Sequence, residues 1–368
     1  MPRSFALFAA LLLCAAASTA QTSAGDLEPL LAAAMDGTKT PALAVLAMRD
    51  GKIAEEAVRG VRRNDRPDLA QIDDAWLIGS DGKPMTAALI AKLVDRGMLS
   101  WTAPLSKMLP ELAKSMRPEY RSVTLVQLLS HRSGLAHDTS DLKFIATFYT
   151  DARSLPRQRL AYIARALKEP PAVPPGTAFS YSNTGFLIAA AIAERATGKS
   201  YEDLMRREVF QPLGVTSAGF GPTHDGQPIG HNNGKPVSKA EDSNPMMFAP
   251  AGNIHMSMND WALFCLDQMA GYHGHGKLLK AATYKMMETP LPGTKNGLSW
   301  GIQDTIAGLK GPVLMHAGSD GNWNALVALF PETSNGALVA TNSAEDMGGD
   351  KASMALLKAL LPSLAPPK

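Results

Sequence analysis

The sequence has little cysteine and no excess of charge, and each absence excludes a class of protein. Cys14 and Cys265 are its two cysteines, so the disulfide framework that stabilises small secreted domains is excluded. The formal net charge is +2 and no run of basic residues occurs, which argues against a nucleic-acid or anionic-membrane contact. Of the 368 residues, 45% are hydrophobic, which is enough for one large domain or two closely packed ones.

The first twenty residues differ from the rest of the chain. A positive charge near the start is followed by an almost wholly apolar run at 4–17, and small residues lead up to Ala20. We therefore predict a signal peptide at residues 1–20, cut after Ala20, and a periplasmic or secreted protein. A membrane anchor is disfavoured because the apolar run is short, and a lipoprotein through Cys14 is disfavoured because a bulky leucine precedes that cysteine.

Removal of residues 1–20 would leave Cys265 as a single cysteine. One cysteine cannot form an internal disulfide, and its position inside the helical pattern at 260–269 favours a small core residue over a nucleophile. We therefore expect the exported chain to fold without disulfides.

The order of strand and helix patterns indicates a sheet built from both ends of the chain. Strands are expected on either side of the Asp50-Gly51 turn, at 42–48 and 53–61, and again at 311–315, 324–330 and 336–342. A final helix at 351–361 is too short to span a membrane and is expected to pack on the sheet. Strands at both ends with helices between them imply one sheet with a helical insertion.

The part between these strands reads as helices and loops. Helices are expected at 26–35, before the first strand, and at 124–130, 183–197 and 200–210, and 219–244 is expected to be a long loop. We predict that residues 21–368 form a single catalytic domain, with a sheet part at about 21–79 and 271–368 and a helical part at about 80–270.

The segment 75–97 contains the first candidate site. A short apolar run leads to Ser80, Lys83 follows three residues later, and apolar residues then recur at helical spacing up to Gly97. Residues three apart on a helix share a face, so the hydroxyl of Ser80 and the amine of Lys83 can meet. In such an S-x-x-K site a lysine can take the serine proton while the serine attacks a carbonyl.

The S-x-x-K spacing occurs a second time, at Ser140 and Lys143. We interpret Ser140 as the N-cap of a helix. The same structural role is the alternative for Ser80, but Ser80 has the better context because it lies between an apolar run and a long amphipathic helix.

Two further segments carry candidate site residues. Tyr181-Ser182-Asn183 is the single Y-x-N of the sequence; a tyrosine beside a lysine can act as a partly ionised proton shuttle, and an asparagine amide can bind a substrate amide or ester. The alternative is a buried tyrosine with an N-cap at Asn183.

The stretch His316-Ala317-Gly318-Ser319 ends a predicted strand, where glycine permits a close backbone approach and edge N–H groups can serve as oxyanion donors. The alternative here is an ordinary strand end followed by a turn.

A metal site has weaker support. His273 and His275 could form half of one, but no second pair with ligand spacing follows them, so a glycine-rich surface loop is favoured.

In this order, the three motifs resemble those of the serine β-lactamase and penicillin-binding-protein family. The similarity is to the class C β-lactamase-like branch, which also holds esterases, D-aminopeptidases and D,D-carboxypeptidases, and it covers nearly the whole chain after residue 20. Residues 128–135 resemble the L-L-x-H-x-S-G-L of this branch, and further matches are Pro175-Gly176-Thr177, Pro212-Leu213-Gly214 and Phe330-Pro331-Glu332.

The resemblance implies an α/β fold of the α+β type: a mostly antiparallel sheet flanked by helices, plus a helical subdomain, with the site in the cleft between them. It implies that Ser80 is acylated, that Lys83 is its base, that Tyr181 relays a proton to the leaving group and that Asn183 orients the substrate. The backbone N–H groups of Ser80 and Ser319 would bind the oxyanion, and neither a metal nor a cofactor is expected.

Two positions depart from the β-lactamase pattern. His316 stands where the antibiotic-destroying members have lysine, and a mostly neutral imidazole holds a substrate carboxylate less well than a permanent cation. This favours esters, amides or D-amino-acid peptides that lack a carboxylate at that position. Asp81 lies ~100° from Ser80 and ~200° from Lys83 around a helix, so it is expected to face away from their pair.

Together, these observations favour an exported serine hydrolase that acts through an acyl-enzyme on esters, amides or peptides. The alternatives are a D,D-carboxypeptidase or β-lactamase, a catalytically silent binding protein on the same scaffold, and a metal-dependent hydrolase. The expected partner is a small-molecule or peptide substrate, with no nucleic acid and no membrane span after signal cleavage.

Overall fold

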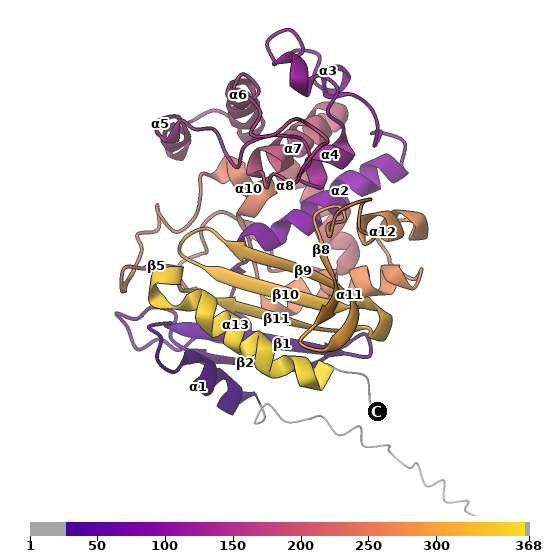
Figure 1. Ribbon diagram of the computed structural model, residues 1–368. Helices are drawn as coiled ribbons and strands as arrows, with labels where there is room; N and C mark the ends of the chain where they lie inside the picture. The colour runs from indigo at the N-terminus through magenta and orange to yellow at the C-terminus, as the bar shows by residue number, and fades with distance from the viewer. Residues whose placement is uncertain (1–26, 365–368) are drawn as a thin grey trace, which may run out of the picture.

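The computed structural model describes residues 27–364. Figure 1 shows a sheet with helices packed against it, and a helical region that lies beyond the β9 side of the sheet. The predicted signal peptide at 1–20 and Cys14 lie outside the described residues. Within residues 27–364 no helix has the length and apolar character needed to cross a membrane.

Strands from both ends of the chain form the main sheet. Its six strands are ordered β2-β1-β11-β10-β9-β8, and every neighbouring pair is antiparallel. Their bounds are Ala42–Arg49 (β1), Lys52–Gly60 (β2), Gly301–Ile306 (β8), Leu309–Ser319 (β9), Asn324–Phe330 (β10) and Asn335–Thr341 (β11). The predicted α/β fold, with an antiparallel sheet built from both chain ends and a helical region, is confirmed.

Helices cover both faces of this sheet, so its central strands are apolar on both sides. On one face, α1 (Glu28–Met35) and α13 (Gly349–Leu360) enclose residues such as Val45 and Val339. Figure 1 shows α13, in yellow, lying across the strands. On the other face, Leu46 and Leu338 belong to the large core that also holds α2 (Lys83–Asp95) and α11 (Met258–Tyr272).

The remaining elements form the helical region and its connections to the sheet. The longest helix there, α7 (Asn183–Thr197), is capped by the Ser182 side chain, which accepts a hydrogen bond from the Gly185 N–H, and it ends at Gly198 in the left-handed conformation. The other helices are α3 (Leu105–Met108), α4 (Leu125–Leu129), α5 (Leu142–Ala146), α6 (Leu155–Ala166), α8 (Tyr201–Met205), α9 (Gln211–Leu213), α10 (Ala249–Gly252) and α12 (Ala281–Met287).

Two expectations about strands were incomplete. Strand β8 was not predicted, because its residues are partly polar and exposed at the edge of the sheet. The stretch 219–244, predicted to be loop throughout, contains the short strands β4 (Gly219–Phe220), β5 (His231–Asn232) and β6 (Lys235–Pro236). Strand β4 joins β3 (Trp76–Leu77) and β7 (Ile254–Met256) in a small sheet directly before the candidate nucleophile.

Candidate active site

The first motif lies where the small sheet meets helix α2. Ser80 is in the 3₁₀ helix Gly79–Gly82, which follows β3, and Lys83 is the first residue of α2. The Lys83 side chain is fully buried. Its Nζ donates hydrogen bonds to Ser80 Oγ at 2.9 Å and to the carbonyl oxygen of Ala251 at 2.5 Å. The predicted meeting of hydroxyl and amine is therefore present in the structure.

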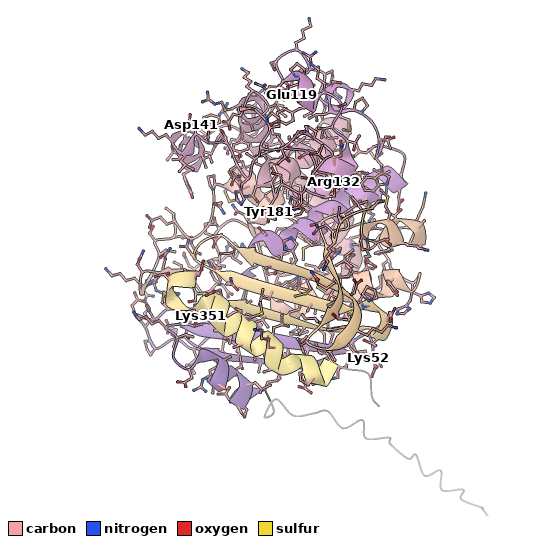
Figure 2. The ribbon with its side chains drawn as sticks, viewed as in Figure 1. Lys52, Glu119, Arg132, Asp141, Tyr181 and Lys351 are labelled. Atoms are coloured by element: carbon pink, nitrogen blue, oxygen red, sulfur yellow. The ribbon has the colours of Figure 1, made fainter. Side chains whose placement is uncertain are left out.

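Tyr181 joins this pair from a distant part of the sequence. Its hydroxyl donates a hydrogen bond to Ser80 Oγ at 2.8 Å, across 101 positions of the chain. The Lys83 ammonium nitrogen lies 4.9 Å from the centre of the Tyr181 ring. Figure 2 shows Tyr181 between the helical region and the sheet. The three side chains predicted to act together thus share one site.

Burial separates the chemical roles that the amine and the phenol can take. It lowers the pKa of Lys83 from 10.5 to about 7, against the opposing charges of Asp138 and Asp81, so a neutral amine is available near neutral pH. Burial also raises the pKa of Tyr181 to about 12, so the phenol stays protonated. The geometry therefore fits Lys83 as proton acceptor and Tyr181 as proton donor, and not a partly ionised tyrosine.

The end of β9 touches the 3₁₀ helix of Ser80 backbone to backbone. A Cβ atom at Gly318 would lie 2.0 Å from the carbonyl oxygen of Ile78, and one at Gly79 would lie 2.6 Å from the Ser319 nitrogen. Both positions therefore require glycine, and Gly79 also has a positive φ of 53°. This contact brings the backbone nitrogens of Ser80 and Ser319 close together, as a pair of oxyanion donors requires.

His316 approaches the same site from β9, on the sheet face that it shares with Leu314. Its Nδ1 lies 2.9 Å from Oδ1 of Asp81. The side-chain partner of Asp81 is His316, and the charge of Asp81 also acts on Lys83; sequence reasoning did not connect Asp81 with His316. A signal was available, since both residues depart from the family pattern.

Asn183 has a different neighbour. Its side-chain nitrogen donates to Oδ2 of Asp138 at 3.1 Å, and its backbone N–H donates to the carbonyl oxygen of His137 at 2.9 Å. The N-cap of α7 is Ser182, so the alternative interpretation of Asn183 as an N-cap is wrong. Asp138 was not predicted; it holds the amide of Asn183 and its charge acts on Lys83. The substrate-orienting role of Asn183 stays a prediction.

A family profile described as Beta-lactamase matches residues 27–361. The chain belongs to the beta-lactamase family. Members of this family are serine hydrolases, among them esterases and peptidases.

Three relatives illustrate the range of this family. The chain is 25% identical over 287 residues to the D-alanyl-D-alanine-carboxypeptidase/endopeptidase AmpH of Escherichia coli K12, which covers 75% of this chain and 72% of AmpH. It is 30% identical over 168 residues to the lovastatin esterase of Penicillium rubens, which covers 41% of each chain. The octameric penicillin-binding protein homologue from Pyrococcus abyssi superposes with a TM-score of 0.75 at 25% identity, covering 93% of this chain and 78% of that one.

The segment 128–135, which resembles the family pattern, contacts the ring of Tyr181 through His131. His131 is buried and its ring stacks on that of Tyr181 with centroids 4.4 Å apart. Its Nδ1 accepts a hydrogen bond from the Ser182 N–H at 3.0 Å. Burial lowers the pKa of His131 well below 6.5, so the ring is neutral. His131 therefore positions Tyr181.

Other serines are poorly placed for chemistry. Ser140 is not the N-cap that we predicted, because Asp141 caps α5 by accepting a hydrogen bond from the Phe144 N–H, and Lys143 is exposed. Residues 297–301 match G-x-S-x-G, the pattern of a nucleophile elbow. There Ser299 is buried and leads into a strand instead of a helix.

The other candidate groups have structural surroundings. Cys265 is fully buried, and burial raises the pKa of its thiol well above 9, as expected for a core residue. His273 shares its Nε2 hydrogen with the carbonyl oxygen of Pro331 at 2.8 Å. Within residues 27–364 no group of three or more histidine, cysteine or acidic side chains is arranged to hold a metal ion.

Proposed function

We propose that this chain hydrolyses esters or amides through an acyl-enzyme on Ser80, and that its substrates carry no carboxylate next to the bond that breaks. One observation carries the proposal: Ser80 Oγ receives hydrogen bonds from both Lys83 Nζ, at 2.9 Å, and the Tyr181 hydroxyl, at 2.8 Å. At this distance a neutral Lys83 amine can accept the serine proton in its turn, while the phenol of Tyr181 remains a donor, and nucleophilic acyl transfer needs both.

In the first half of the reaction, Ser80 Oγ forms a bond to the substrate carbonyl carbon while its proton passes to neutral Lys83. The negative oxygen that develops is held by the N–H groups of Ser80 and Ser319. The bond to the leaving group then breaks, and the leaving group takes the proton of the Tyr181 hydroxyl. Lys83 then returns its proton to the Tyr181 oxygen. In the second half, water attacks the acyl carbon, its proton passes to the Lys83–Tyr181 pair, and Ser80 leaves with that proton as the acid is released.

Histidine in the third motif supports esters and amides as substrates, because His316 supplies no permanent cation for a substrate carboxylate. The similarity to a lovastatin esterase supports the same choice. A D,D-carboxypeptidase or β-lactamase is the second candidate, and the longer match to AmpH favours it. The exported location that we propose rests on the sequence of residues 1–20.

The test compares two serine variants of the purified protein. We expect Ser80→Ala to lower kcat/KM for 4-nitrophenyl butyrate by at least about 10³-fold, and Ser140→Ala, which lies in the second S-x-x-K, to leave it unchanged. Mass spectrometry should place the butyryl group on the peptide that contains Ser80. Equal turnover by Ser80→Ala and the parent protein would refute the proposal, and labelling by a fluorescent penicillin without ester turnover would favour the second candidate.

A further inference from the structure

The neighbour of the nucleophile is a buried carboxylate with one side-chain partner. Asp81 is 1% exposed, and its Oδ1 lies 2.9 Å from His316 Nδ1. Its Oδ2 has no hydrogen-bond partner among residues 27–364. His316 Nδ1 also lies 3.1 Å from the carbonyl oxygen of Ala317. Two acceptors around one ring nitrogen require that Nδ1 carries a hydrogen, which fixes the tautomer and leaves Nε2 as the other polar atom of the ring.

The charge of Asp81 acts on the whole site. Burial raises its pKa from 3.8 to about 6, while the hydrogen bond and charge of His316 and the charge of Lys83 oppose that rise. The carboxylate is therefore largely ionised near neutral pH. Tyr181 and Cys265 also feel this charge. A cation at position 316 would therefore be paired with the Asp81 carboxylate, which has no other side-chain partner in the part of the chain that the structure describes.

We propose that Asp81 determines specificity: it holds His316 by Nδ1 and places a negative charge beside that position, so that substrates bearing a carboxylate there are rejected. This inference rests on the proposed function and extends it: discrimination against carboxylate-bearing substrates becomes a property of Asp81 and His316 together, and not of His316 alone. A lysine at position 316 would form an ion pair with Asp81, and the Asp81 carboxylate would neutralise its charge. Both residues must therefore change before the site gains a free cation.

The experiment uses two esters of one acid that differ in a carboxylate on the leaving group, 4-nitrophenyl butyrate and 3-carboxy-4-nitrophenyl butyrate. The readout is the ratio of kcat/KM for the anionic ester to that for the neutral ester. We expect His316→Lys alone to change this ratio less than about threefold, and the double variant Asp81→Asn/His316→Lys to raise it by at least about tenfold, as removal of one nearby charge allows. The gain should shrink at high salt.

Three results would overturn the inference. The parent protein could prefer the anionic ester, His316→Lys alone could give the full gain, or the folded double variant could give none. Asn at position 81 keeps an oxygen that can accept from position 316, and thermal melting verifies the fold of each variant. If a variant does not fold, the preference of the parent protein remains a test. If the parent protein showed no ester turnover that depends on Ser80, this result would instead refute the proposed function.

Discussion

The lowered pKa of Lys83 makes the pH dependence of the reaction predictable. With a pKa of about 7, roughly half of Lys83 is neutral at pH 7, whereas an unperturbed lysine with a pKa near ~10.4 would be neutral about 0.04% of the time. Burial therefore raises the share of competent enzyme by about 10³-fold. We expect kcat/KM for a neutral ester to rise with pH through an apparent pKa of about 7 and to level off above it.

The perturbation that tests this origin is Asp138→Asn. The charge of Asp138 raises the pKa of Lys83 against the effect of burial, so its removal should move the rising limb to lower pH by roughly half to one unit. The asparagine keeps an oxygen that can accept the hydrogen bond from Asn183. Asp65→Asn is the control, because this carboxylate is paired with Arg63 at the surface and should leave the limb in place.

The assay records 4-nitrophenyl ester hydrolysis from pH 5 to pH 9 at constant ionic strength, with Ser80→Ala as the blank. A limb that is still rising steeply at pH 9 would show that Lys83 keeps an ordinary pKa, and a shift to higher pH in Asp138→Asn would contradict the electrostatic argument.

Two further substitutions test the donor and the scaffold. Tyr181→Phe removes the proton donor while keeping the ring on His131, so we expect kcat to fall by about 10²–10⁴-fold, and steady-state kinetics should show a larger loss for an amide than for a nitrophenyl ester. Arg159 bridges the buried carboxylates of Glu194 and Glu202, so Arg159→Met leaves both without their cation. Denaturant unfolding should show that the free energy of unfolding falls by about 3–5 kcal/mol. Arg153→Met at the surface should leave the unfolding midpoint nearly unchanged, and equal effects of the two substitutions would contradict this account.

Features that depend on nearby residues could be predicted from the sequence. The helix after Ser80 is local, and its spacing alone brings Lys83 to the hydroxyl. The first hairpin and α7 likewise follow from turn residues and apolar periodicity. Tyr181 and the strand end at Gly318 came from the order of motifs in a related family and not from local physics.

What was missed depends on contacts between distant segments or on small differences in position. The pair of Asp81 and His316 spans 235 positions, and no local pattern specifies such a contact. Strand β8 was missed because an edge strand needs apolar residues on one face only. The cap at Asp141 lies one residue from the cap expected at Ser140, and the cap at Ser182 lies one residue from the alternative considered at Asn183, since neighbouring polar residues compete to accept the same backbone N–H groups.

The pairing of β1 with β11 has a consequence for synthesis. The backbone N–H of Ala42 donates a hydrogen bond to the Asn342 side chain across 300 positions. Strand β1 therefore cannot complete its pairing until β11, near the end of the chain, has been synthesised. Ser80 and Ser319 are likewise far apart in the sequence, although their backbones lie close together in the fold, so nearly the whole polypeptide must be synthesised before these two segments can meet. Contacts between segments this far apart in the sequence are expected to form late and to slow folding.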